Sequence, residues 1–264
     1  MGNFHRLTVL VALLLMGCSG LHALSRDEPA NALAPTGTLR VAFISGSPIH
    51  ATRDAVSGEF KGVAIDLGKE LARRIGVPFK PVPYSSVPAL LAAAKDGEWD
   101  VATLGVNAER ALAVDFSAPY MEVEFGYLVP GGSSIASLSE VDRPGVRIGV
   151  VEKASPDVYL NRTIRSATLV RAPSVAGLFE LLHAGKVDAV FATKASILSQ
   201  AAKFPGSRVL EGRSGGEETA MAAPKGRGEA SRYLREFVES VKAEGLVKAA
   251  IERAALRGVA VAVK

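Results

Sequence analysis

The chain carries one sequence pattern twice, in register, at residues 86–100 and 174–188. In both copies a Ser precedes apolar residues at helical spacing, a Gly follows them, and an apolar run then begins. Because Ser favours helix starts and Gly favours helix ends, the copies predict helices followed by strands at 99–104 and 187–192. Two such units predict two similar α/β lobes. Open parallel sheets bind ligands outside the carboxyl ends of their strands, so facing lobes predict a ligand cleft.

Composition limits the classes of function. The 264 residues suffice for one large domain or two small ones, and 48% hydrophobic with 22% charged residues is typical of a soluble globular protein. The net charge is +4 and the basic residues are scattered, so nothing indicates a nucleic-acid partner. The sequence has no metal-ligand spacing, phosphate-binding Gly-rich loop or Gly-x-Ser-x-Gly elbow. We therefore expect no metal and no cofactor.

The first residues have the form of an export signal. Arg6 precedes a mainly apolar run at 7–16, which is too short to span a bilayer but matches the hydrophobic region of a secretory signal. Cys18, the only cysteine, follows Leu-Met-Gly, and this resembles the lipobox of bacterial lipoproteins. We predict a signal peptide at 1–17 and lipid attachment to Cys18, with an ordinary signal cleaved later as the alternative. The mature protein is then periplasmic and anchored to a membrane.

The rest of the chain divides into a tether and two lobes. We predict a flexible tether at 18–36, a first lobe at 37–124 and 220–264, and a second lobe at 125–219. The tether mixes Ser, Gly, Ala, Pro and Asn without periodicity. Extended crossings between the lobes are expected near 125–129 and 219–223, and a turn at 115–120. The tail from residue 257 onward is an alternating apolar piece to which the sequence assigns no role.

Six segments carry a resemblance that covers residues 37 to about 256. They are GVAIDL at 62–67, GEWDV at 97–101, ERALAVDFSAPY at 109–120, RIGV at 147–150, GKVDA at 185–189 and KAEGL at 242–246. In this order they resemble the bacterial extracellular solute-binding proteins of family 3, the amino-acid-binding type. The resemblance implies an α/β, two-lobed periplasmic-binding-protein fold with two hinge crossings. It also implies a small-molecule ligand and, as partner, the inner-membrane permease of an ATP-driven importer.

The resemblance also assigns ligand contacts. Arg110 stands where the family places the arginine that grips the ligand's carboxylate, a role suited to a planar guanidinium that stays charged. The alternative is a surface arginine paired with a neighbouring carboxylate. Thr103, Gly105 and Ser155 stand at positions that supply hydroxyls or amides around the ligand. For Ser155 a plain helix N-cap is the alternative, and a helix beginning at Pro156 is expected.

Three departures from the family pattern bear on the ligand. Thr193 replaces the carboxylate that binds the α-ammonium group, Ser47 lies where an aromatic residue flanks the ligand, and Lys153 replaces a glycine. A buried ammonium needs a carboxylate to offset its desolvation. We therefore expect a small organic anion or other carboxylate-bearing solute whose negative groups contact Arg110 and Lys153. The alternative for Lys153 is exposure to solvent. His50 is a further candidate contact.

A different class of function is compatible with the same scaffold. Cyclohexadienyl dehydratases share this fold but need an acid–base group aimed into the cleft. Thr193 cannot serve, and the only carboxylate expected near the second-lobe loop is Glu152. We therefore expect no catalytic residue and a binding protein rather than an enzyme. A ligand-sensing accessory protein is the third hypothesis.

Overall fold

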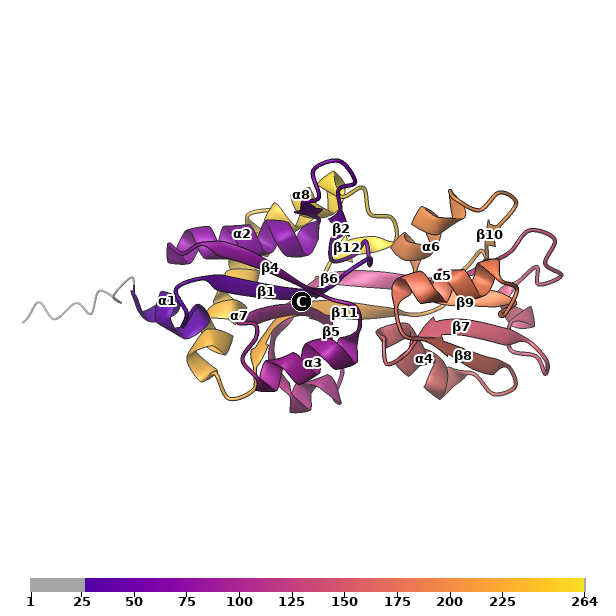
Figure 1. Cartoon of the computed structure of the whole chain (residues 1–264), viewed down its shortest axis with the longest axis horizontal. Coiled ribbons are helices and arrows are strands. Elements are labelled where there is room, and N and C mark those ends of the chain that lie inside the picture. The colour runs from indigo at the N-terminus through magenta and orange to yellow at the C-terminus, as the bar shows by residue number, and fades with distance from the viewer. Residues whose placement is uncertain (1–26, 264) are drawn as a thin grey trace, which may run out of the picture.

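The computed structural model describes residues 27–263. Its helices are α1 (Asp27–Leu33), α2 (Val63–Ile75), α3 (Val87–Lys95), η1 (Arg110–Leu112), η2 (Leu138–Glu140), α4 (Ser155–Thr163), α5 (Val175–His183), α6 (Lys194–Ala201), α7 (Gly228–Ala243) and α8 (Leu246–Arg253). Its strands are β1 (Leu39–Ile44), β2 (Thr52–Arg53), β3 (Phe60–Lys61), β4 (Phe79–Tyr84), β5 (Val101–Gly105), β6 (Val114–Val129), β7 (Arg147–Val151), β8 (Thr168–Ala172), β9 (Ala189–Thr193), β10 (Arg208–Val209), β11 (Gly216–Pro224) and β12 (Val259–Val261). Figure 1 shows two lobes side by side along the long axis.

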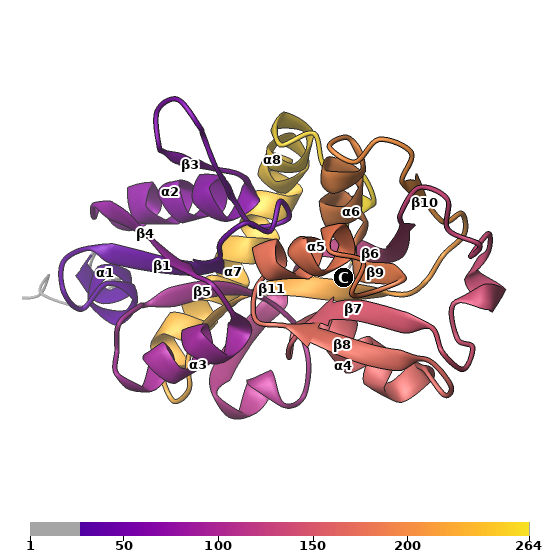
Figure 2. The same cartoon turned by 45° about the vertical axis from the view of Figure 1, so that its right-hand side comes forward.

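Each lobe is built on three parallel strands. In the first lobe β1 pairs with β4 and β5, and in the second lobe β7 pairs with β8 and β9. The antiparallel strands β11 and β6 lie between these groups, giving the order β4-β1-β5-β11-β6-β9-β7-β8. Helices pack on the faces of each group (Figures 1 and 2). The predicted α/β, two-lobed fold is confirmed.

The two copies of the repeated pattern form equivalent helix–strand units. Ser86 caps α3 and Ser174 caps α5, each hydroxyl accepting a hydrogen bond from the backbone N–H three residues on, at 3.4 and 3.2 Å. Gly97 and Gly185 follow the helices with φ of 65° and 62°. Glycine adopts this left-handed conformation without the steric cost that other residues incur. Both helices therefore begin and end for the local reasons that the sequence indicated.

The equivalence extends to one ion pair in each lobe. Asp100 ends the first copy and accepts two hydrogen bonds from the Arg40 guanidinium, at 2.9 and 2.8 Å. Asp188 ends the second copy and accepts the same pair of bonds from Arg147, at 3.0 and 2.7 Å. Each Asp also accepts the backbone N–H of its arginine. These pairs fix the start of the first parallel strand in each lobe.

The lobes are connected where β6 and β11 meet. Gly216 pairs with Glu124 in the first-lobe sheet, whereas Phe125 pairs with Thr193 of β9 in the second lobe. The Phe125 N–H donates to the Gly215 carbonyl at 3.0 Å. The return crossing predicted at 219–223 lies instead inside β11, paired with β5 and β6. The five side chains at 219–223, three of them alanines, are fully buried because the strand is central in the sheet.

Two further segments differ from the sequence prediction. Residues 115–120, expected as a turn, belong to β6, and Pro119 faces Ala220 at an irregularity in the β6–β11 pairing. Proline is tolerated there because the ladder is already interrupted. The predicted tether at 18–36 includes α1, and Leu33 at its end is fully buried in the first-lobe core. The tail forms β12, which pairs with β6.

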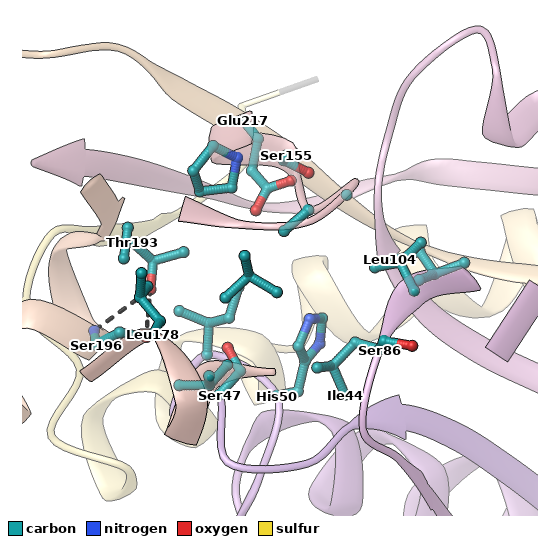
Figure 3. Close-up of a pocket in the computed structure, with 18 of the residues that line it drawn as sticks. Ile44, Ser47, His50, Ser86, Leu104, Ser155, Leu178, Thr193, Ser196 and Glu217 are labelled. Carbon is teal, nitrogen blue, oxygen red and sulfur yellow. Dashed lines mark hydrogen bonds between the residues drawn. The ribbon is translucent and has the colours of Figure 1, made fainter. Parts of the chain in front are cut away.

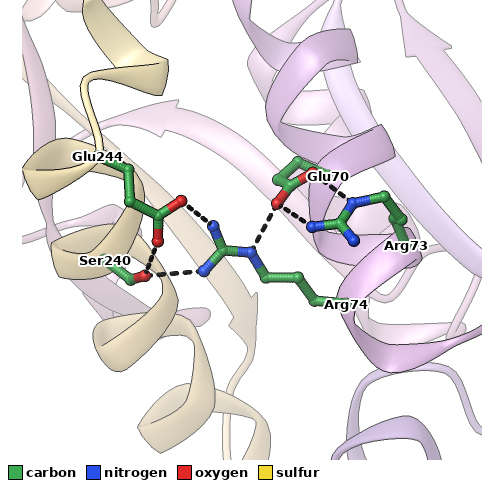
Figure 4. Close-up of polar contacts among 5 residues, drawn as sticks. All are labelled: Glu70, Arg73, Arg74, Ser240 and Glu244. Atoms are coloured by element: carbon green, nitrogen blue, oxygen red, sulfur yellow. Dashed lines mark hydrogen bonds and ion pairs between the residues drawn. The ribbon is translucent and has the colours of Figure 1, made fainter.

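Helix α7 is joined to α2 by a polar network (Figure 4). Arg74 donates to Glu70 at 2.7 Å within α2, to the Ser240 hydroxyl at 2.8 Å and to Glu244 at 2.7 Å. Arg73 adds two bonds to Glu70. The hydrogen bond from Arg73 is the largest of the effects that lower the pKa of Glu70 to about 2. Apolar residues of α7 and α8 are buried in the same core as β1 and α2.

Candidate ligand-binding site

A pocket lies between the lobes and is lined by residues of both (Figure 3). Its volume is about 70 Å³. Gly105, the last residue of β5, and Thr193, the last residue of β9, both line it. Ser86 and Val175, at the starts of the repeat helices, line it as well. Equivalent positions of the two repeat copies therefore face the same space, as expected for facing strand ends.

Arg110 joins the two lobes at this pocket. It is 4% exposed, and its Nη1 donates to the Gly105 carbonyl at 2.7 Å and to the Ser155 hydroxyl at 3.0 Å. Its Nη2 donates to the Lys153 carbonyl at 3.1 Å. Burial lowers the pKa of Arg110, with the nearby Glu217 acting in the opposite direction. An arginine nonetheless stays charged, so the pocket contains a fixed cation.

Two N–H groups of Arg110 have no acceptor among the hydrogen bonds of residues 27–263. A guanidinium has five N–H donors, and three of them bind the acceptors described above. The two that remain are on Nε and Nη2. These are the nitrogens with which Arg40 and Arg147 hold their carboxylates in this same protein. The alternative of a surface arginine does not hold, and Asp115 pairs with Lys225 instead, at 2.7 Å.

Glu217 is a pocket residue that the sequence analysis missed. It lies on β11, and its Oε2 is buried without a hydrogen-bond partner among residues 27–263. Burial raises the pKa of Glu217, while Arg110 and the Ser155 hydroxyl act in the opposite direction. A Cβ on Gly105 would lie 1.7 Å from Glu217 Oε2. The signal in the sequence was Gly105 itself, because its missing side chain leaves room for a group from elsewhere.

Thr103 and His50 lie together beneath the pocket. Thr103 is fully buried and does not line the pocket, but its hydroxyl lies 3.0 Å from His50 Nδ1. His50 lines the pocket. Burial, and to a lesser extent Arg110, lowers the pKa of His50 to about 3, so the imidazole is neutral. Ser47 also lines the pocket and is buried.

The other residues predicted to contact the ligand have different roles in the structure. The Thr193 hydroxyl caps α6, accepting the Ser196 N–H at 3.3 Å and lying 2.7 Å from the Ser196 hydroxyl. Ser155 is the first residue of α4 and does not cap it, which leaves its hydroxyl to accept from Arg110. The Lys153 side chain is exposed and outside the pocket lining; only its carbonyl takes part. Cys18 lies outside the described residues.

Within the described part of the chain, no group of three or more His, Cys, Asp or Glu side chains could hold a metal ion. Over the same residues, no helix combines the length and hydropathy that a membrane crossing requires. Among the described residues, the polar groups of the pocket are Arg110, Glu217, a neutral His50 and several hydroxyls, set against an apolar wall.

Comparison with known proteins gives consistent matches. The sequence model of the bacterial extracellular solute-binding proteins, family 3, matches residues 39–254. A probable histidine-binding protein of Neisseria gonorrhoeae is 27% identical over 201 residues, 74% of this chain and 72% of that protein. A cyclohexadienyl dehydratase of Pseudomonas aeruginosa is 25% identical over 188 residues, 70% of this chain and 69% of that protein. A solved structure of an ancestral arginine-binding protein bound to glutamine has a TM-score of 0.73 and 28% identity, covering 82% of this chain and 97% of that one.

Proposed function

This chain belongs to the bacterial extracellular solute-binding proteins of family 3, and we propose that it captures a small carboxylate-bearing solute between its lobes for an ATP-driven importer. It is a solute-binding protein of the amino-acid-transport type. The observation that carries the proposal is Arg110, a buried guanidinium in the interlobe pocket with two N–H groups left for a ligand. A carboxylate accepts such a pair of bonds and also neutralises the charge.

Closure of the lobes accounts for capture. Arg110 belongs to the first lobe but donates to Ser155 and to the Lys153 carbonyl in the second. A solute bound at Arg110 is therefore enclosed by both lobes, and the closed form differs in shape from the open one. The relatives named for histidine and for arginine bind ligands that carry a carboxylate, which supports the same assignment for this chain.

A ligand screen tests this function. The full mature chain is heated with L-amino acids, dicarboxylates and small sulfonates, and stabilising solutes are titrated by calorimetry. A ligand at 100 times its dissociation constant stabilises by about 2.7 kcal/mol, so binding is visible as a higher Tm. We expect Arg110→Ala to weaken binding at least tenfold, because losing a charge-assisted pair in a desolvated site costs about 2–5 kcal/mol.

The matched control is Arg232→Ala, which removes an exposed guanidinium from α7. This variant should bind as tightly as the wild type. Equal affinity of Arg110→Ala and Arg232→Ala for every stabilising solute would contradict the proposed role of Arg110.

Glu217 favours an enzyme as the second candidate. A carboxyl group with a raised pKa aimed into a pocket is what general acid–base catalysis requires, and one relative is a cyclohexadienyl dehydratase. A dehydratase would convert many equivalents of prephenate or arogenate per protein molecule. We expect no turnover, and Glu217-dependent turnover would replace the binding function with the enzymatic one.

Uptake measurements separate transport from sensing. Deleting the gene should abolish uptake of the solute found in the screen. A ligand-sensing accessory protein would bind the same solute, but its deletion would leave uptake unchanged and alter a transcriptional response instead.

The membrane anchor belongs to the same proposal. The lipobox-like segment before Cys18 supports cleavage there and a lipid-anchored periplasmic protein. Cys18→Ala should release a soluble species or leave the precursor uncut, as membrane fractionation and intact-mass measurement would show. A wild-type protein that is fully soluble and carries no lipid would contradict it.

A further inference from the structure

We propose that Glu217 binds the cationic group of the ligand, so that the pocket selects a neutral zwitterion, namely an α-amino acid with an uncharged side chain. The inference rests on the proposed function and adds the class of solute. It assigns to β11 the ligand contact that the sequence pattern had placed at Thr193. Thr193 cannot supply it, because it is neutral and its hydroxyl is engaged in capping α6.

An ionised Glu217 balances the charge of Arg110 in this pocket, and Arg110 favours that form by lowering the pKa of Glu217 against the effect of burial. Arg110 and Glu217 are the charged side chains among the described residues that line it, and the third titratable group, His50, is neutral. A ligand with one carboxylate and one ammonium group gives each charge one partner. A dicarboxylate would leave a buried anion without a cation, and a basic amino acid would leave a buried cation without an anion. Either excess charge is costly in a desolvated site.

Arg110 and Glu217 both lie beside Gly105, so that one α-amino acid could reach both charges. Gly105 has no side chain to fill this space, and its carbonyl accepts a hydrogen bond from Arg110 at 2.7 Å. The position of a Cβ on Gly105 is 1.7 Å from Glu217 Oε2 and 2.5 Å from Ser155 Oγ. The Ser155 hydroxyl is in turn 3.0 Å from Arg110 Nη1. The Arg110 guanidinium, from η1, and the Glu217 carboxylate, from β11, therefore reach the same small region.

Glu217 has an unused acceptor that points into the pocket. Figure 3 shows its carboxylate directed at the pocket interior, on the side opposite Ser47 and His50. Its Oε2 is buried and accepts no hydrogen bond from the part of the chain that the structure describes. An unpaired buried acceptor costs free energy, and an ammonium group would recover it with a charge-assisted bond. The raised pKa of Glu217 has the same cause, namely burial.

The rest of the pocket has no partner for a third charge. Its wall is largely aliphatic and aromatic, including Ile44, Leu104, Leu178 and Phe191. The remaining polar groups there are mainly hydroxyls, which can bind a neutral group of the ligand but cannot neutralise a charged one. The whole pocket has a volume of about 70 Å³, which favours a small ligand.

The first test compares ligands on the wild-type protein and needs no variant to fold. Each of the twenty L-amino acids is titrated against its matched carboxylic acid in which hydrogen replaces the ammonium group, together with dicarboxylates. We expect a neutral amino acid to bind at least tenfold more tightly than its matched acid. Tightest binding by a dicarboxylate, a basic amino acid or an acid without an ammonium group would overturn the inference while leaving the proposed function standing.

The second test uses Glu217→Gln, which keeps the size of the side chain and removes its charge. The matched control is Glu218→Gln, because Glu218 is the next residue of β11, exposed and outside this pocket. We expect Glu217→Gln to lower the preference for the amino acid over its matched acid at least tenfold, and Glu218→Gln to retain it. An unchanged preference in folded Glu217→Gln would overturn the inference. If no carboxylate-bearing solute binds the wild type, the inference and the proposed function both fail.

Discussion

A carboxylate that binds the ligand's ammonium group could stand at position 193 or come from β11, and in this chain position 193 is a threonine. Its hydroxyl caps α6, while Glu217 offers a carboxylate from β11 on the other side of the pocket. Gly105 makes that possible, because any side chain there would occupy the position of the Glu217 carboxylate. The specificity of the site therefore depends on a residue pair, Gly105 and Glu217, that lies far apart in the sequence.

At this scale we predict the effect of Thr193→Asp. Aspartate still caps a helix, so α6 should form normally, but the pocket then holds two carboxylates and one guanidinium. Lysine or arginine, with two cationic groups, should bind at least tenfold more tightly than to the wild type, as calorimetry would measure. Thr193→Asn is the matched neutral control and should show no such gain. Equal gains in the two variants would show that charge is not the cause.

At the scale of elements, the α2–α7 network links segments that are distant in the sequence. Glu70 accepts hydrogen bonds from Arg73 and Arg74, and Arg74 also donates to Glu244, the residue that caps the C-terminus of α7. The pKa of Glu70 is lowered to about 2 by these donors. A carboxyl group whose pKa is depressed on folding stabilises the protein above its ordinary pKa and loses that contribution as the pH falls.

The prediction at this scale is therefore a pH dependence. Between pH 5 and about 2 the unfolded state binds the proton at Glu70 first, so the free energy of unfolding should fall with falling pH. Glu70→Gln should remove about 2 kcal/mol of that fall, since one pKa unit corresponds to about 1.4 kcal/mol and solvent screens part of it. Urea unfolding at several pH values measures this. Glu236→Gln, at an exposed site on α7, should follow the wild type. Parallel curves for all three proteins would contradict the prediction.

At the scale of the whole molecule, the tail helps to hold the lobes together. Strand β12 pairs with β6, and the Gly258 carbonyl accepts the Glu124 N–H at 2.8 Å. Lys194 of the second lobe binds Glu124 at 2.7 Å and packs its stem against Gly258. Three segments from both lobes thus meet beside the hinge.

We predict that Gly258→Ala disturbs this junction. Gly258 has φ of 72°, and a Cβ there would lie 2.7 Å from Lys194 Cδ. Backbone strain alone costs about 1–2 kcal/mol, and the collision with Lys194 adds to it. Gly226→Ala is the matched control, with φ of 86° and open space around the added methyl group. Urea unfolding should show a larger loss for Gly258→Ala, and equal losses would mean that the tail does not brace the lobes.

The sequence alone determined the features that depend on interactions between neighbouring residues. Helix caps at Ser86 and Ser174, the stops at Gly97 and Gly185, and the strands after them depend on residues only a few positions apart. The repeat itself predicted two α/β lobes, and the resemblance added the ligand-binding position of Arg110, which lies buried at the pocket between the lobes.

The tertiary structure decided what depends on distant partners. The β6–β11 pairing brings Glu217 beside Gly105, across 112 positions of sequence, and it moves the return crossing to Gly215 and Gly216. The Ser155 hydroxyl, for which a helix cap was the alternative role, accepts from Arg110 of the other lobe, and the Lys153 side chain is exposed. No local pattern encodes these contacts, because each joins groups from different elements that become neighbours only when the chain has folded.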